Sequence, residues 1–269
     1  MVLMKNHPSM TNSPYQMELW GIGLVKISDI HSRGNFEIIY QKGIGIPIIQ
    51  DIMELCKKDI KDDKQGNSVI AMDDFTLFIH HFQNNGEIFV LIYMDENEYN
   101  MNFSRLYLFT KRIDIAIQLN KSLDHIISIF DDVIIIPKIK GIIALFIIGS
   151  SGSLYFSKIN KDKSTIAEQD VNISGFISAL FSFSGEIMSK ETGAKLKEIN
   201  FGDRKFYMII KNKVIFAFLV KNLNPLIQRY MYLIADEFLM EFKEDLKKFN
   251  GSVVPFRKFE EIINQYFII

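Results

Sequence analysis

Hydrophobic residues fall into two similar hairpin patterns, and these patterns predict the core of the chain. Residues 205–220 form two apolar arms, rich in aromatic and β-branched residues, around a polar turn at 211–213. The second arm is apolar at consecutive positions, which indicates a strand that is covered on both faces. Residues 75–94 repeat the pattern with Asn-Gly at 85–86, the strongest short hairpin signal, because both turn residues must tolerate a positive φ.

The elements predicted around each hairpin occur in the same order. The first half is predicted to contain strands at 19–27 and 36–40, a helix beginning at Pro47, a strand at 68–71, the hairpin, and helices at 103–119 and 122–130. The second half is predicted to contain strands at 141–148 and 154–159, a helix at 174–188, a strand at 194–200, the hairpin, a long helix at 226–246 capped by Asn224 and Pro225, and a last helix after Pro255 that includes Phe267. The repeated order predicts two copies of one α/β module.

The boundary between the copies is predicted within residues 131–140. An acidic pair, a short apolar run, Pro137 and two lysines follow one another there. Proline lacks an N–H and disfavours helix in the residue before it, so we expect a short, extended link. The predicted organisation is a flexible N-terminal tail at 1–16, a first domain at 17–136 and a second domain at 137–269.

This element order resembles the longin fold, most clearly at residues 142–153, 173–188 and 206–220 with the helix that follows. The resemblance implies, for each module, an α/β (α+β) fold. A five-stranded, largely antiparallel sheet would have one helix on one face and two on the other, with the first and fifth strands at its centre. Two modules in one chain are similar to tandem-longin proteins: the longin modules of Rab-GTPase exchange-factor subunits, the Hermansky–Pudlak proteins, and Fuzzy and Inturned. The exchange-factor subunits usually carry three longin modules, whereas this chain has room for two.

Charge and cysteine content narrow the classes of function. The chain has 31 basic and 32 acidic residues and a net charge of −1, which gives no electrostatic reason to propose nucleic acid as a partner. The single cysteine, Cys56, excludes an intramolecular disulfide and a multi-cysteine metal site, and suits a reducing cytoplasm. It lies in an apolar helical pattern, so we expect a buried structural thiol.

No segment of the sequence is predicted to span a membrane. The most apolar region, 133–148, is interrupted by Pro137, Lys138 and Lys140, and the uncharged remainder is far shorter than the roughly 20 residues that a spanning helix needs. The polar N-terminus lacks the apolar region of a signal peptide. We therefore expect a cytoplasmic protein with at most peripheral membrane association.

Candidate chemical groups do not combine into a catalytic, metal or cofactor site. The predicted strands and turns contain the glycines at 21, 23, 43, 45 and 149. None of these glycine motifs has the third glycine that a dinucleotide-binding loop requires. His80 and His81 are adjacent on a strand and point to opposite faces, so they cannot share a metal ion; one is expected to be buried and the other solvated. The acidic pairs at 73–74 and 131–132 are expected in turns. We predict a protein that is not an enzyme and has no cofactor.

The predicted helix at 174–188 is apolar on two stripes. Phe176, Leu180, Phe183 and Ile187 can face the sheet, and Ile177, Phe181 and Met188 form a second stripe roughly 100° around the helix. A surface helix needs only one such stripe, so the second would pack against the other module or a loop, or would form an intermolecular contact. In longin modules this helix commonly lies at the pairing interface, and the resemblance therefore implies an interface at the following residues: Phe176, Ile177, Leu180, Phe181 and Met188.

The leading hypothesis is a non-catalytic tandem-longin interaction protein. It would form a dimer with itself, or with another longin or roadblock-type subunit, and would bind a small GTPase in membrane trafficking or signalling. In one version of this hypothesis the protein is part of a guanine nucleotide exchange factor. One alternative is a tethering or adaptor scaffold without exchange activity. A small-molecule sensor is the other alternative; it requires buried polar residues around a cavity, whereas phenylalanine, isoleucine and leucine fill the predicted sheet faces.

Overall fold

Two compact units make up the chain. The computed structural model describes residues 16–28, 36–62, 65–97, 101–149, 151–160, 175–177, 179, 197–202 and 204–269. The first unit comprises Met1–Ile44 and Ile49–Pro137, and the second comprises Gly45–Ile48 and Lys138–Ile269. The predicted flexible tail, apart from Gln16, lies outside the described residues.

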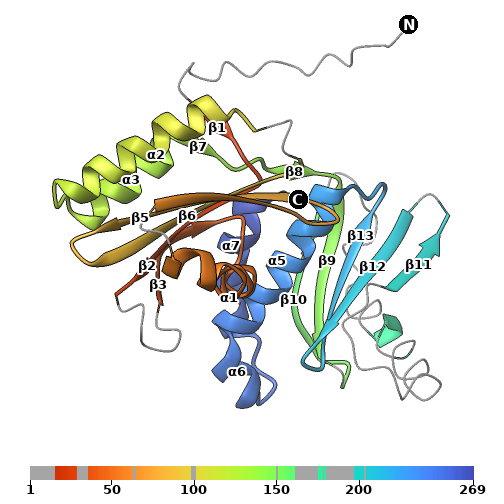
Figure 1. Ribbon diagram of the computed structural model, residues 1–269. Coiled ribbons are helices and arrows are strands. Elements are labelled where there is room, and N and C mark those ends of the chain that lie inside the picture. Colours follow the sequence, from red (N-terminus) through yellow and green to blue (C-terminus); the bar gives the residue numbers. More distant parts are fainter. Residues whose placement is uncertain are drawn as a thin grey trace, which may run out of the picture. The chain divides into compact units, whose positions relative to one another are not determined.

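The first unit contains one five-stranded sheet, drawn in red to yellow in Figure 1. Its strands lie in the order β3-β2-β6-β5-β4, and every neighbouring pair is antiparallel. The elements of this unit are β1 (Met17–Glu18), β2 (Gly21–Ile27), β3 (Phe36–Lys42), α1 (Ile46–Asp62, of which this unit contains the part from Ile49 onward), β4 (Gln65–Ala71), β5 (Thr76–Asn84), β6 (Glu87–Asp95), α2 (Phe103–Gln118), α3 (Leu123–Val133) and β7 (Ile134–Ile135).

The second unit repeats this topology strand for strand. Its sheet has the order β10-β9-β13-β12-β11, again antiparallel throughout. Its elements are β8 (Ile139–Lys140), β9 (Ile142–Gly149), β10 (Leu154–Ile159), β11 (Lys197–Phe201), β12 (Arg204–Lys211), β13 (Val214–Val220), α5 (Pro225–Glu241), α6 (Lys243–Lys247), η2 (Val254–Lys258), α7 (Phe259–Tyr266) and β14 (Phe267–Ile268). The predicted fold class is confirmed, and the first and fifth strands of each sheet are central neighbours, as expected.

Helices cover both faces of the first sheet. On one face, a Cβ built on Gly23 of β2 would lie 3.4 Å from the Ile49 side chain of α1. On the other face, the Tyr93 hydroxyl of β6 shares a hydrogen bond of 2.7 Å with Thr110 of α2. Helix α3 joins α2 on that second face through a contact between the rings of Phe109 and Phe130, and both helices lie above the sheet in Figure 1.

The second sheet has the same two layers of helices. Phe216 of β13 packs against Phe238 of α5, and Phe156 of β10 packs against Phe259 of α7, so α5 and α7 cover one face. On the opposite face, Ile177 is buried in a cluster with residues of the central strands. One helix on one face and two on the other is therefore the arrangement in both units.

A short parallel strand pair closes each unit, and the sequence pattern does not reveal it. Met17 of β1 lies opposite Ile134 of β7, and Ile139 of β8 lies opposite Phe267 of β14. Two-residue strands show no alternation that could be recognised in a sequence. Because β14 begins at Phe267, our placement of that residue on the last helix was wrong.

Two further expectations at helix ends were wrong. The long helix of the second module stops at Glu241, and the chain continues as the separate short helix α6. Asp131 and Asp132 lie in the last turn of α3 rather than in a turn between elements. Asp131 accepts a hydrogen bond of 2.9 Å from the Tyr40 hydroxyl of β3, which gives this end of α3 a tertiary contact.

Candidate functional site

The outer strand β4 of the first sheet presents an uncharged edge. Its seven residues, Gln-Gly-Asn-Ser-Val-Ile-Ala, pair with β5 from Gln65↔Phe82 to Ala71↔Thr76 without a register shift. In the described part of the chain no strand pairs with the other edge of β4. A regular edge with unpaired N–H and C=O groups can accept a strand from another polypeptide.

The other three outer strands carry features that oppose such pairing. Strand β3 contains Glu37 and Lys42 and has a register shift against β2. Strand β10 contains Lys158 and has a register shift against β9. Strand β11 has only five residues and begins with Lys197 and Glu198. Charges, irregular register and short length are common ways to protect a sheet edge, and β4 has none of them.

Exposed apolar side chains lie beside this edge. Val69 of β4 lies opposite Phe78 of β5, and the ring of Phe78 contacts that of Phe103, at the start of α2, with centroids 5.5 Å apart. Tyr107 follows Phe103 one helical turn later, and Met72 follows directly after β4. We call β4 together with Val69, Met72, Phe103 and Tyr107 the edge surface; all four of these side chains are exposed.

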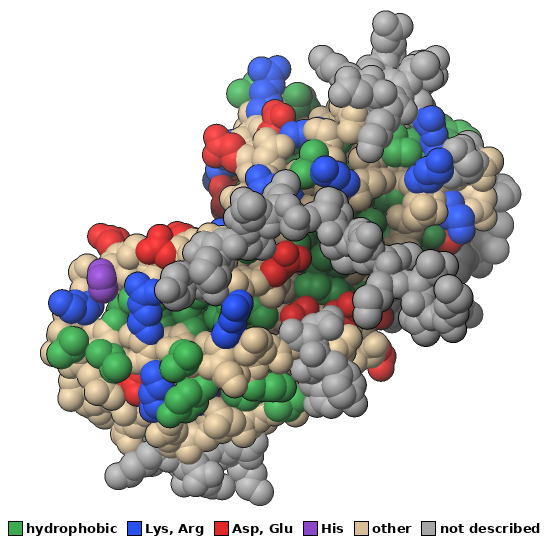
Figure 2. Space-filling view, turned by 90° about the horizontal axis from the view of Figure 1, so that it is seen from above, with side chains coloured by type: hydrophobic (Ala, Val, Ile, Leu, Met, Phe, Trp, Pro, Cys, Tyr) green, Lys and Arg blue, Asp and Glu red, His purple; other side chains and the backbone are tan. Residues whose placement is uncertain are grey.

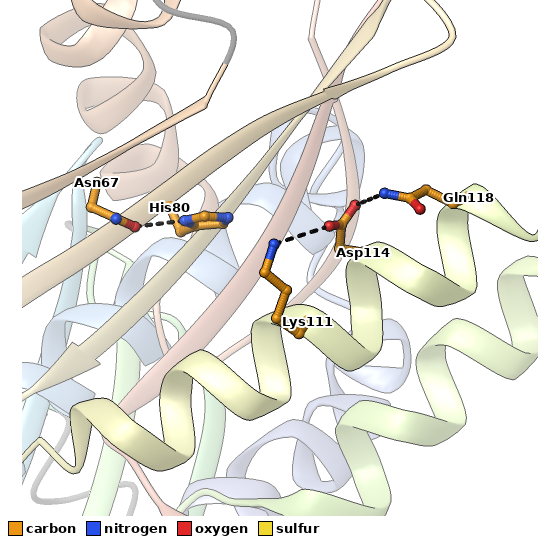
Figure 3. A network of polar contacts seen from close by, with 5 residues as sticks. All are labelled: Asn67, His80, Lys111, Asp114 and Gln118. Carbon is orange, nitrogen blue, oxygen red and sulfur yellow. Dashed lines mark hydrogen bonds and ion pairs between the residues drawn. The ribbon is translucent and has the colours of Figure 1, made fainter.

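A small polar network lies beneath α2, next to the edge surface (Figure 3). His80 Nδ1 of β5 is 2.5 Å from the amide oxygen of Asn67 on β4. An amide oxygen only accepts, so Nδ1 carries the proton of a neutral imidazole. On α2, Asp114 accepts a hydrogen bond of 2.9 Å from Gln118 and lies 3.5 Å from the Lys111 ammonium.

Burial keeps this imidazole neutral. It lowers the pKa of His80 to about 4, the positive charges of Lys111 and His81 act in the same direction, and the carboxylate of Asp114 opposes them. The buried Nε2 has no hydrogen-bond partner among the described residues. A neutral histidine with this environment stabilises packing under α2 rather than transferring protons near neutral pH.

The expectation that one of the two histidines is solvated was wrong. His80 is 4% exposed and His81 is 3% exposed, on opposite faces of β5. The ring of His81 packs on Gly66 of β4, where an added Cβ would come within 2.5 Å of the ring. The described residues contain no group of three or more histidine, cysteine or acidic side chains arranged to hold a metal ion.

The predicted interface helix is described only in part. Residues 175–177 and 179 are helical, and Leu180, Phe181 and Met188 lie outside the described residues. Ile177 is fully buried against the second sheet, whereas Phe176 is 46% exposed. At these two positions our assignment of the stripes was the wrong way round, because Ile177 and not Phe176 faces the sheet.

Comparisons with known proteins give a slight structural similarity. No family profile matches the chain, and no curated protein matches it in sequence. Among solved structures, MglB of Myxococcus xanthus is similar at 13% identity, over 38% of this chain and 77% of MglB, with a TM-score of 0.30. That likeness is too slight to support an argument, whereas the two repeated sheets with their helix layers identify the architecture directly. The chain has a tandem longin-like fold.

The edge surface of this longin-like chain was missed in the sequence. Residues 68–71 were predicted as a strand, but a strand's place at the edge of a sheet depends on which neighbours pair with it. The absence of charge in residues 65–71 was the only available signal, and it is also typical of an interior strand.

None of the helices that the structure describes is both long enough and apolar enough to cross a membrane.

Proposed function

We propose that the chain is a non-catalytic interaction protein that pairs with a second polypeptide through β4. The partner would be a second copy or another longin or roadblock-type subunit, and the assembled pair would bind a small GTPase in membrane trafficking or signalling in the cytoplasm. The observation that carries the pairing is the regular, uncharged edge of β4. The GTPase as a partner is inferred from the tandem longin-like order of elements, with proposed domains at 17–136 and 137–269.

The edge surface combines two sources of affinity. Backbone hydrogen bonds to the seven residues of β4 would fix the register of an added strand. The neighbouring apolar side chains of Val69, Phe103 and Tyr107 are exposed and would be covered by alternate residues of that strand. In strand addition the main-chain hydrogen bonds contribute affinity, and the burial of alternate side chains contributes specificity and further free energy.

Exchange of nucleotide by such an assembly needs no acid–base residue. A surface that binds the GTPase more tightly in a conformation with low nucleotide affinity shifts the population toward that conformation. We therefore include exchange-factor activity in the proposal and test it separately from pairing.

The helix around residues 174–188 is the second surface that we propose for association. Phe176 is exposed there, and Leu180, Phe181 and Met188 belong to the same proposal from the sequence. Ile177 contributes to the core of the second unit, so its substitution would report on stability rather than on association.

The test compares Val69→Lys with a matched control, Val254→Lys, which introduces the same charge at an exposed valine of the second unit. Both variants should keep the free energy of unfolding within about 0.5 kcal/mol of the natural chain, because both positions are exposed. Sedimentation velocity then measures self-association. Affinity capture of the tagged chain with mass spectrometry identifies a heterologous subunit and a GTPase.

We expect the natural chain and Val254→Lys to associate, and Val69→Lys to lose its partner. A monomeric natural chain that captures no GTPase would refute the proposed function. Association that Val69→Lys leaves intact would refute β4 as the pairing surface. The captured GTPase is then loaded with fluorescent GDP: faster release identifies an exchange factor, and an unchanged rate identifies a tethering or adaptor scaffold.

A further inference from the structure

Helix α2 carries an apolar stripe on the side that faces away from the sheet. Leu108, Ile115 and Leu119 are 67%, 53% and 64% exposed, although leucine and isoleucine are usually buried. They lie at positions i, i+7 and i+11, from the second turn of α2 to its C-cap, a spacing that places them on one line. We call these three residues the α2 stripe.

The stripe is not needed for the core of its own unit. Helix α2 already buries Leu106, Phe109 and Ile113 toward the sheet and α3. The stripe is on the outer side of the helix, about 80–180° around from those residues at 100° per residue. Three large apolar side chains in line on a solvent-facing surface are typical of a seam that receives another helix.

The exposed charges of α2 and of the turn that follows it all have one sign. From Phe103 to Lys121 the exposed charged side chains are Arg105, Arg112 and Lys121, and no acidic side chain is exposed. The one carboxylate of the helix, Asp114, is buried beside Lys111 and Gln118. Arg112 lies between Leu108 and Ile115 on the same side of the helix, so a positive charge is part of the seam itself.

We propose that the α2 stripe docks an amphipathic helix of a partner protein, with acidic residues flanking the apolar seam of that helix. The seam would pack on Leu108, Ile115 and Leu119, and its carboxylates would pair with Arg112 and Lys121 at the rim. In Figure 2, green hydrophobic and blue Lys and Arg side chains lie side by side on the part of the surface at the left. This inference does not depend on the edge surface or on GTPase binding.

An anionic membrane fits the surrounding charges less well. Helix α3 covers the same face of the sheet as α2 and exposes Asp124 and Asp132. A bilayer would cover both helices together, and its negative surface would repel these carboxylates. A single helix laid along α2 meets the basic side chains without covering α3. The acidic helix is therefore the occupant that the charges favour.

The test uses two synthetic helical peptides of about five turns. Both have leucine at the a and d positions of a heptad; one has glutamate and the other lysine at the flanking positions. Binding of each fluorescent peptide to the full chain is followed by anisotropy. The variants are Ile115→Ser with Leu119→Ser, which removes the apolar contact, and Arg112→Glu, which reverses the seam charge.

Matched controls elsewhere in the chain keep the comparison specific. Leu55→Ser removes an exposed leucine of α1, and Lys248→Glu reverses an exposed charge in the second unit. All substituted side chains are exposed, so circular dichroism and thermal melting should match the natural chain. The serine pair and the charge reversal act by different means, so each tests the proposal without the other.

We expect the glutamate peptide to bind at least about tenfold more tightly than the lysine peptide, which corresponds to about 1.4 kcal/mol. The serine pair and Arg112→Glu should each weaken its binding by about tenfold or more, and the two controls should bind as the natural chain does. Failure of the glutamate peptide to bind, or equal binding by all variants, would overturn the proposal.

Two other occupants give distinct results. Co-sedimentation with phosphatidylserine vesicles but not with phosphatidylcholine vesicles, lost in Arg112→Glu, would overturn the proposal in favour of a membrane surface. A concentration-dependent dimer in sedimentation that the serine pair abolishes would overturn it in favour of a second copy of the chain.

Discussion

Mild acid should destabilise the first unit through His80. The pKa of this imidazole is about 4 in the folded chain, against 6.5 for the ordinary side chain. Below pH 6.5 the unfolded state binds a proton that the folded state resists, so the stabilisation is complete above pH 6.5 and is lost as the pH falls toward 4. Burial is the main cause, and the charges of Lys111 and His81 add to it while Asp114 opposes them.

The size of the effect follows from the two pKa values. At pH 5 the unfolded imidazole is almost fully protonated and the folded one is mostly neutral, which corresponds to a loss of about 2 kcal/mol. The limit at full protonation of both states is about 3 kcal/mol. Domains are typically stable by about 5–15 kcal/mol, so a loss of this size is easily measured.

The assay is urea unfolding at pH 7 and pH 5, followed by the fluorescence of Trp20. This residue is the one tryptophan of the sequence and is buried in the first unit, so it reports on that unit. His80→Leu places an apolar side chain of similar volume under α2 and removes the titrating imidazole. The exposed Asn67 amide, which loses its partner, can then form a hydrogen bond with water. His125→Asn, at an exposed position of α3, is the control.

We expect the natural chain and His125→Asn to lose about 2 kcal/mol more than His80→Leu between the two pH values. The carboxyl of Asp95, whose pKa is raised by burial, favours folding as the pH falls. It is present in all three proteins, so its effect cancels in the comparison. Equal losses in all three would refute the reasoning from the burial of His80.

Two substitutions test the packing and capping of the sheets and helices. Gly66→Ala should lower the free energy of unfolding by about 1–3 kcal/mol, because its Cβ would lie 2.5 Å from the His81 ring. Adding His81→Ala should recover part of this loss in urea unfolding, and a full loss in the double variant would contradict the clash. Asn224→Ala should cost about 1 kcal/mol by removing the cap of 2.7 Å to the Ile227 N–H of α5. Asn224→Ser should retain most of the stability in thermal melting, and equal melting of the alanine and serine variants would rule out the cap as the cause.

Local signals in the sequence determined the hairpins and the helix starts. Asn85 and Gly86 have positive φ, as do Asn212 and Lys213 in the second hairpin, so both turns occur where the sequence predicted them. Ser122 and Asn224 cap α3 and α5 with their side chains. These features depend on residues within one turn of each other, so a single sequence contains all of the information.

The central strands were predictable for a related reason. Strands β9 and β13 are apolar at consecutive positions and are buried along their whole length. Only a strand covered on both faces buries such a pattern, so the pattern predicted a place at the centre of a sheet with helices on both sides. The repeat of element order then predicted the same arrangement in both units.

Tertiary structure alone decided the features that depend on neighbours distant in sequence. His81 is buried because Gly66, on the adjacent strand, has no side chain. Ile177 rather than Phe176 faces its sheet. The sequence could not decide between them, because both apolar stripes of the helix fit the sheet equally well as patterns. The edge of β4 and the outer stripe of α2 are exposed because no strand or helix in the described part of the chain packs against them. A sequence records which side chains are apolar, but only the folded chain determines which of them remain in contact with water.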